Sequence, residues 1–159
     1  MSKWKKIKNP WIGCEGYNCF GCAPSNPYGV KMEFYDTGDK IVSRWKPLSQ
    51  FQGWIDTLHG GIQAVLLDEI CAWAVMRQAQ RVGVTSKMVT QYKRPVSTND
   101  EFIDLEACVV EQRRNIYKVE AAIYNMNHEL CTIAECTYFT YSPEKARIDM
   151  GFENCEIEE

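Results

Sequence analysis

Two periodicities of hydrophobic positions follow one another along this chain. Between residues 29 and 45, apolar residues alternate with polar ones on either side of a turn, so a β-hairpin is predicted there. From about Gly60 to Gln80, apolar residues cover more than one face of a helix, which predicts a helix that is largely buried. Gly83 is expected to end it.

The remainder of the chain is rich in β-branched and apolar residues. Strands are predicted at residues 85–93, 102–112, 116–124 and 130–141. Long strands in direct succession favour an antiparallel sheet. The predicted fold class is therefore α+β: an antiparallel sheet of five to six strands wrapped around one long central helix.

The chain has 159 residues, which suits a single domain with one core. We expect an irregular segment at 1–28, where Pro and Gly are dense, a folded domain at 29–142 and an acidic C-terminal tail at 143–159. Both charged ends are expected to be solvated.

Charge and hydropathy argue against several classes of function. A net charge of −3 argues against general nucleic-acid binding, which needs a basic surface. No apolar run approaches the length of a membrane span, and no apolar segment follows the lysines near the start as it would in a signal peptide. We expect a cytoplasmic protein without a membrane or nucleic-acid partner.

The segment from residue 58 to residue 69 carries the most informative motif. It places a His59-Gly60-Gly61 turn at the start of the predicted helix and two carboxylates, Asp68 and Glu69, about two turns inside it. Free N–H groups at a helix start can stabilise a developing oxyanion. Because a carboxylate is costly to bury in an apolar helix, its presence needs a reason. Together these features indicate acyl chemistry.

Four further runs accompany the His-Gly-Gly turn. In one of them a predicted strand ends in Arg-Pro, at the distance from the turn that is found in the family named below. The five runs are 19–22, 26–30, 58–61, 68–69 and 92–96. Over residues 16–141 or so, the chain thereby resembles the hotdog-fold acyl-CoA thioesterases of the phenylacetate-pathway and medium-chain type. The resemblance implies hydrolysis of an acyl-CoA to a carboxylic acid and CoA, and no cofactor is expected.

The chemistry of thioester hydrolysis assigns roles to two residues of the motif. The N–H of Gly60 is the expected oxyanion donor, and Asp68 is the expected general base for water or a nucleophile. On one helix the two are separated by roughly 12 Å, so one carbonyl cannot reach both. They must then come from two subunits with antiparallel helices. This predicts an obligate homodimer with shared sites, which is also the arrangement in the resembled family, and a further assembly into a homotetramer is open.

The neighbouring positions receive supporting roles. Asp68 is preferred over Glu69 because the family's catalytic carboxylate lies nine residues after the His; a polar contact at the dimer interface is the alternative for Asp68. His59 is expected to position the loop or the substrate carbonyl, or else simply to pack in the loop. Thr85 is expected to help hold the water, or else only to begin a strand.

Substrate contacts are expected from basic and aromatic residues. In similar proteins the region of Lys93 and Arg94 lies near the nucleotide end of CoA, whose phosphates suit basic groups, although exposed basic residues are common at strand ends. Gly61 is counted with these binding residues. Trp54, together with Phe51 and Trp73, is expected to flank the acyl tunnel.

The chain contains eight cysteines, three of which lie in the N-terminal segment. Cys19 and Cys22 have the spacing of zinc ligands, and Cys14 precedes them. No paired motif follows to complete a tetrahedral site, so a packed loop and no metal site are expected.

Two other functions remain open from the sequence. One is a non-catalytic module that binds or senses an acyl-CoA or an acyl carrier. The other is a hydratase or dehydratase on the same fold, although the spacing of Asp56 and His59 is shorter than in the hydratase motif.

Overall fold

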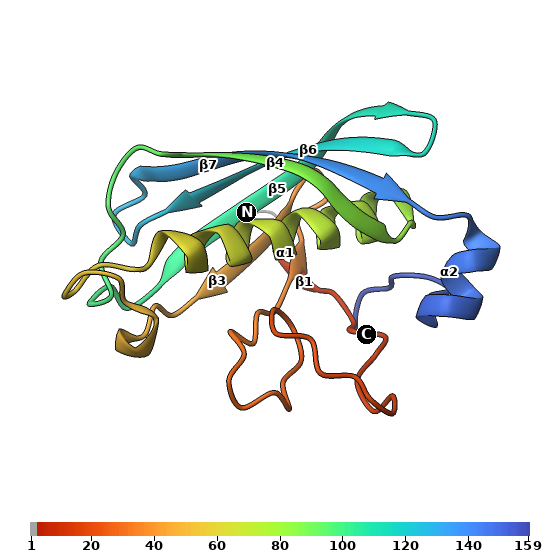
Figure 1. Cartoon of the computed structure of the whole chain (residues 1–159), viewed down its shortest axis with the longest axis horizontal. Helices are drawn as coiled ribbons and strands as arrows, with labels where there is room; N and C mark the ends of the chain where they lie inside the picture. The colour runs from red at the N-terminus through yellow and green to blue at the C-terminus, as the bar shows by residue number, and fades with distance from the viewer. Residues whose placement is uncertain (1–2) are drawn as a thin grey trace.

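One long helix, α1 (Gly60–Ala79), lies across one face of an antiparallel sheet (Figure 1). The computed structural model describes residues 3–159, so residues 1 and 2 of the predicted N-terminal segment lie outside it. The sheet has seven strands in the order β1-β2-β3-β5-β6-β7-β4. The strands are β1 (Lys5–Lys6), β2 (Tyr35–Asp36), β3 (Ile41–Trp45), β4 (Gly83–Tyr92), β5 (Ile103–Arg113), β6 (Ile116–Tyr124) and β7 (Leu130–Thr140). A 3-10 turn, η1 (Ser49–Phe51), and a short helix, α2 (Pro143–Met150), complete the chain.

The predicted α+β architecture is confirmed. The central helix and the four long strands form where the sequence places them, within two or three residues at each end. The sheet has seven strands rather than five to six because two-residue strands, β1 and β2, extend it at one edge.

The core lies between α1 and the face of the sheet that it covers. Leu66, Leu67, Ile70, Ala74 and Val75 of α1 are fully buried. In β5 and β6, buried and more exposed residues alternate along the strand, as expected for a sheet with only one covered face. Burial of each leucine, isoleucine or valine side chain among them stabilises the fold by about 2 kcal/mol.

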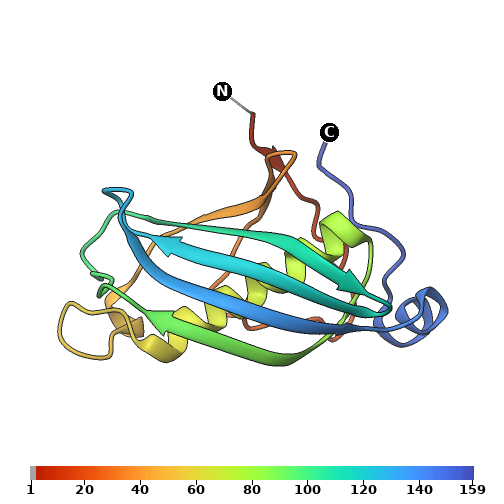
Figure 2. The same cartoon turned by 90° about the horizontal axis from the view of Figure 1, so that it is seen from above.

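Strand β4 forms one edge of the sheet (Figure 2). It pairs with β7 over its full length, and no other strand pairs with it among residues 3–159. A register shift between Thr85 and Lys87 interrupts this pairing, which is typical of a β-bulge. Ten residues of edge strand, most of them exposed, therefore present unpaired N–H and C=O groups.

The predicted hairpin at 29–45 forms only in part. Strand pairing is limited to Tyr35 and Asp36 opposite β3. Val30, Met32 and Phe34 are buried as their alternation predicts, but Lys31 has a left-handed φ of 54° that interrupts the extended chain. The backbone at Val30 and Met32 instead hydrogen-bonds to the loop at 20–21. The alternation of apolar and polar residues here therefore indicates which side chains are buried, but it does not indicate that the segment pairs as a strand.

The charged side chains at both ends are nearly all exposed, as predicted, but the segments that carry them are folded and are not free tails. Residues 143–159 form α2 and then return to the N-terminal segment, where Ile157 makes a β-bridge with Ile7. Phe152 and Cys155 are buried, and the Phe152 ring stacks on Trp11 at 6.1 Å. The buried apolar residues beside the glutamates bring the segment back onto the fold, while the glutamates themselves stay exposed. None of the described helices is both long and apolar enough to cross a bilayer.

Substitution of Phe152 tests whether the C-terminal segment belongs to the core. We expect Phe152→Ala to lower the free energy of unfolding by about 3 kcal/mol in urea titrations, because a buried ring is replaced by a cavity. Glu153→Ala, at the adjacent exposed position, is the control and should change stability little. Equal stability of the two variants would mean that the segment is solvated after all.

Candidate active site

The N-terminus of α1 is closed by a histidine. His59 is the N-cap residue, and its Nδ1 accepts a hydrogen bond from the N–H of Gly61 at 2.8 Å. The N–H of His59 itself donates to the carbonyl of Phe51. A Cβ on Gly61 would lie 3.0 Å from Nδ1, so glycine leaves room for the imidazole. This geometry gives His59 a positioning role and occupies the N–H of Gly61.

Gly60 keeps its N–H free. This group has no hydrogen-bond partner among residues 3–159, and as the first helical N–H it points out of the helix end. The carbonyl of Gly60 accepts a hydrogen bond of 2.7 Å from the Tyr92 hydroxyl, at the end of β4. Tyr92 was not singled out from the sequence, although it opens the run at 92–96, because only the fold places it over the helix start.

A cavity of about 490 Å³ lies at this end of the helix. Of the predicted site residues, Trp54, His59, Gly60, Lys93 and Arg94 line it. It is bounded by the loop before α1 and by the residues that follow β4. Arg94 is exposed and only loosely paired with Glu129, at 3.8 Å, so its charge remains available to a ligand.

Asp68 and Thr85 meet further along the helix. The Thr85 hydroxyl donates a hydrogen bond of 2.6 Å to Oδ1 of Asp68. Thr85 lies at the bulge of β4, where such irregularities often re-aim a side chain. Asp68 is half-buried and Thr85 is exposed, so the pair is within reach of solvent. A fixed carboxylate of this kind can accept a proton from water.

Two cysteines lie beneath this pair. The Cys136 sulfur is 4.0 Å from the Thr85 hydroxyl, and Cys71 lies beside it, fully buried. The hydrogen bond between the two thiols, followed by burial, raises the pKa of Cys71 well above its usual value. The same bond lowers the pKa of Cys136. Cys71 is therefore a neutral packing residue.

The structure separates the two adjacent carboxylates. Asp68 faces β4, whereas Glu69 faces the N-terminal loop and accepts a hydrogen bond from Trp73 Nε1 at 3.1 Å. Successive residues of a helix point about 100° apart, so the two cannot serve the same site. Only Asp68 lies on the side of the edge strand.

Within one chain the oxyanion donor and the carboxylate stay apart. Gly60 and Asp68 belong to the same uninterrupted helix, eight residues apart, which separates them by about 12 Å. Asp68 and Thr85 are not among the residues that line the cavity at Gly60. One chain therefore carries two halves of a site and does not bring them together.

Of the three aromatic residues predicted to flank the acyl tunnel, one lines the cavity at Gly60 and two do not. Trp54 is highly exposed and lines the cavity. Phe51 packs against Trp45 and is not among the lining residues. The prediction that Trp73 flanks an acyl tunnel is wrong: it is buried and stacks on Phe34 at 4.8 Å.

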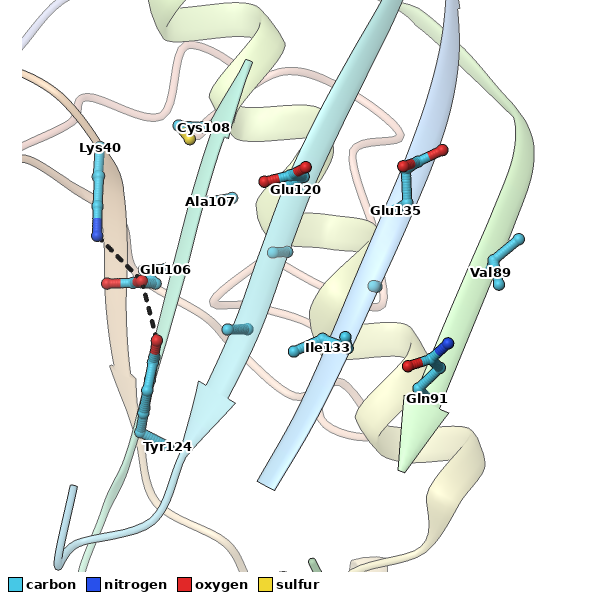
Figure 3. A pocket seen from close by; sticks show the side chains of 13 residues that line it. Lys40, Val89, Gln91, Glu106, Ala107, Cys108, Glu120, Tyr124, Ile133 and Glu135 are labelled. Atoms are coloured by element: carbon cyan, nitrogen blue, oxygen red, sulfur yellow. Dashed lines mark hydrogen bonds and ion pairs between the residues drawn. The ribbon is translucent and has the colours of Figure 1, made fainter. Parts of the chain in front are cut away.

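A larger hollow of about 700 Å³ lies on the sheet face turned away from α1 (Figure 3). Glu120 on β6 and Glu135 on β7 stand directly opposite each other there, an arrangement that is destabilising for like charges. Glu106 is paired with Lys40 at 3.0 Å. A surface with this excess of carboxylates does not suit the phosphates of a nucleotide.

Comparison with known proteins agrees with this fold. Residues 56–132 match the family model described as the thioesterase superfamily. No curated protein matches the chain. Among solved structures, zebrafish thioesterase superfamily member 2 has 25% identity and a TM-score of 0.66, covering 75% of this chain and 88% of its own.

Two bacterial structures are similar in fold. The PaaI protein of the E. coli phenylacetic acid degradation operon has 18% identity and a TM-score of 0.63, covering 71% of this chain and 81% of its own. The BH2602 protein of Bacillus halodurans, solved with CoA, has 24% identity and a TM-score of 0.57, covering 63% of this chain and 66% of its own. The chain spans 57% of the length of another thioesterase superfamily protein with a TM-score of 0.68.

These matches define the class of protein. The chain has the hotdog fold, and its central part, from the loop before α1 into β7, matches the thioesterase superfamily. The resemblance predicted from the His-Gly-Gly motif is thereby confirmed.

The helix cap makes a first test of this geometry. We expect His59→Ala to lower the free energy of unfolding by about 1 kcal/mol, because the N–H of Gly61 loses its acceptor. His59→Asn should retain most of the stability, since asparagine is a good N-cap residue. Urea titration of both variants measures the difference, and an equal loss in the two would contradict the capping role.

Proposed function

We propose that this protein hydrolyses acyl-CoA thioesters in active sites shared between the two subunits of a homodimer. One observation carries the proposal: a single helix presents a free N–H at Gly60 and a fixed carboxylate at Asp68, on the side of an unpaired edge strand.

Gly60 supplies the oxyanion donor. The thioester carbonyl oxygen accepts a hydrogen bond from the free N–H of Gly60, and the helix dipole adds favourable potential at that point. His59 and Tyr92 hold this end of the helix through their bonds to Gly61 and Gly60. Charge that develops on the carbonyl oxygen then meets a donor that is already in place.

Asp68 activates the nucleophile. Thr85 donates to one carboxylate oxygen, and the other accepts a proton from a water molecule. The resulting hydroxide attacks the carbonyl carbon to give a tetrahedral oxyanion. Collapse of this intermediate breaks the carbon–sulfur bond, and the CoA thiolate leaves and takes up the proton. In the alternative route the carboxylate itself attacks and water hydrolyses the anhydride.

The dimer follows from strand β4. Its row of unpaired backbone groups is a ready template for pairing with the same strand of a second subunit. Antiparallel pairing of two β4 strands about a two-fold axis sets the two α1 helices side by side and antiparallel. Gly60 of one subunit then approaches Asp68 of the other, which closes the gap of about 12 Å that one chain leaves.

Two basic residues that follow β4 suit the phosphates of CoA. Lys93 and Arg94 offer positive charge for phosphates, and the exposed Trp54 offers an apolar surface beside them. The structurally similar Bacillus halodurans protein was solved with CoA, which supports CoA as the acyl carrier.

Release of free CoA thiol from a panel of aromatic and aliphatic acyl-CoAs tests the proposal. We expect Asp68→Asn to lower kcat by about 10²-fold or more, because the amide cannot accept the proton from water. Thr85→Ser should keep most of the activity and Thr85→Val should lose more of it. The eight cysteines of the protein require an enzyme-only blank in each assay.

Glu120→Gln, on the far face of the sheet, is the matched control and should be fully active. Sedimentation must show that each variant keeps the oligomeric state of the wild type. Unchanged turnover in Asp68→Asn would contradict the assignment. Tight acyl-CoA binding with no turnover in the wild type would favour a binding module instead.

A further inference from the structure

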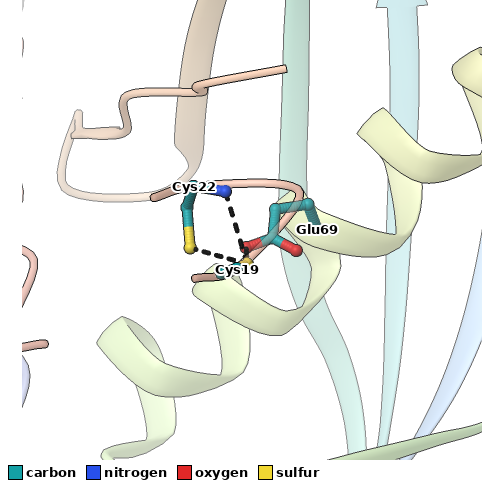
Figure 4. Close-up of side chains that lie close together, drawn as sticks. All are labelled: Cys19, Cys22 and Glu69. Carbon is teal, nitrogen blue, oxygen red and sulfur yellow. Dashed lines mark hydrogen bonds between the residues drawn. The ribbon is translucent and has the colours of Figure 1, made fainter. Parts of the chain in front are cut away.

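Three groups that can bind metal ions meet between the N-terminal loop and α1 (Figure 4). The sulfur atoms of Cys19 and Cys22 are 3.2 Å apart, and the Cys19 sulfur is 3.5 Å from Oε1 of Glu69. One ligand atom from each residue lies within 4.8 Å of the other two. Cys19 and Glu69 are half-buried and Cys22 is buried.

We propose that Cys19, Cys22 and Glu69 bind Zn²⁺, at a site that fastens the N-terminal loop to the central helix. The spacing of Cys19 and Cys22 suits zinc, but no second pair of ligands follows Cys22, so the sequence alone predicts no metal site. The structure provides the third ligand from α1, fifty positions after Cys19. The inference is independent of thioester hydrolysis, since Glu69 faces away from Asp68 and Thr85.

The loop has the form of a metal-binding turn. The N–H of Cys22 donates to the Cys19 sulfur at 3.4 Å, and the N–H of Ala23 donates to the Cys19 carbonyl at 3.0 Å. The first of these hydrogen bonds stabilises a thiolate, which is the form that binds a metal, and the second closes the turn.

The loop and the carboxylate are also fitted to each other. A Cβ on Gly21 would lie 2.4 Å from the Glu69 carboxyl group, so a larger residue could not let Glu69 approach the sulfurs.

Outer groups orient the ligands. Trp73 Nε1 donates to Glu69 Oε1 at 3.1 Å and thereby holds the carboxylate oxygen that lies near the Cys19 sulfur. The Tyr17 hydroxyl is 3.0 Å from the Cys22 sulfur and is itself held by Asn9 at 2.9 Å. Such outer hydrogen bonds commonly set the position of metal ligands.

The charge of the cluster also calls for a cation. Two thiols and a carboxylate converge, and Glu69 takes part in no ion pair among residues 3–159. Zn²⁺ prefers thiolate with carboxylate or imidazole, at Zn–S distances of about 2.3 Å. Tetrahedral coordination then needs sulfurs about 3.8 Å apart, a small opening of the observed pair, and leaves the fourth position to water.

Titration of the full chain with Co²⁺, a spectroscopic substitute for zinc, tests the proposal. The protein is kept reduced with a phosphine, which also excludes a Cys19–Cys22 disulfide. We expect one equivalent of Co²⁺ to give a thiolate charge-transfer band and the visible bands of a tetrahedral complex, and Zn²⁺ to abolish both. Absence of these bands in the wild type overturns the proposal.

Variants assign the ligands. Cys19→Ser and Cys22→Ser should lose the bands, and Glu69→Gln should weaken Co²⁺ binding at least about tenfold. Cys14→Ser, at the exposed cysteine of the same segment, should bind as the wild type does. Bands that survive in Cys19→Ser, or disappear in Cys14→Ser, contradict the assignment.

A second measurement does not depend on how well the variants fold. In the wild type, one equivalent of Zn²⁺ should slow the alkylation of Cys19 and Cys22, mapped by peptide mass spectrometry, and leave that of Cys14 unchanged. Equal rates with and without Zn²⁺ would overturn the proposal.

Discussion

The length of one rigid helix governs how this protein can work. Gly60 and Asp68 sit on the same uninterrupted helix α1, so hydrogen bonding within that helix holds them about 12 Å apart. No side-chain rearrangement in a single chain can bring both to one carbonyl. The proposed chemistry therefore requires a second subunit, and we propose that it pairs along the exposed edge of β4.

The rest of the structure holds this helix in place, and its faces contact different parts of the fold. The fully buried side chains of α1 fix it to the sheet. Its N-terminus is held by the cap from His59 and by the hydrogen bond from Tyr92 to the Gly60 carbonyl. One side of the helix contacts β4 through Asp68 and Thr85. The opposite side meets the N-terminal loop through Glu69. Adjacent carboxylates in the sequence thus serve two unrelated places, because a helix turns by about 100° per residue.

Local patterns in the sequence predicted the parts that local physics controls. The periodicity of apolar residues predicted α1 and the four long strands, whereas the role expected of Thr85 beside Asp68 came from the resemblance to a family. Sequence patterns failed to predict the structure of segments whose conformation depends on contacts with distant parts of the chain. The alternation at Val30–Phe34 indicated buried side chains but not strand pairing. The acidic C-terminal segment folds back onto the domain, with Phe152 and Cys155 buried. The contact of Cys19 with Glu69 spans fifty residues, and no spacing rule reveals it.

Subunit complementation tests the shared site most directly. Gly60→Pro removes the N–H at the first helical position, where proline is well tolerated, and Gly60→Ala keeps the N–H as its control. Neither Gly60→Pro nor Asp68→Asn should be active alone. When the two are unfolded together and refolded as a mixture, half of the dimers contain one chain of each kind, and each of these has one intact site. We predict recovery of about a quarter of wild-type activity. No recovery in a mixture that demonstrably forms mixed dimers would contradict a site shared between subunits.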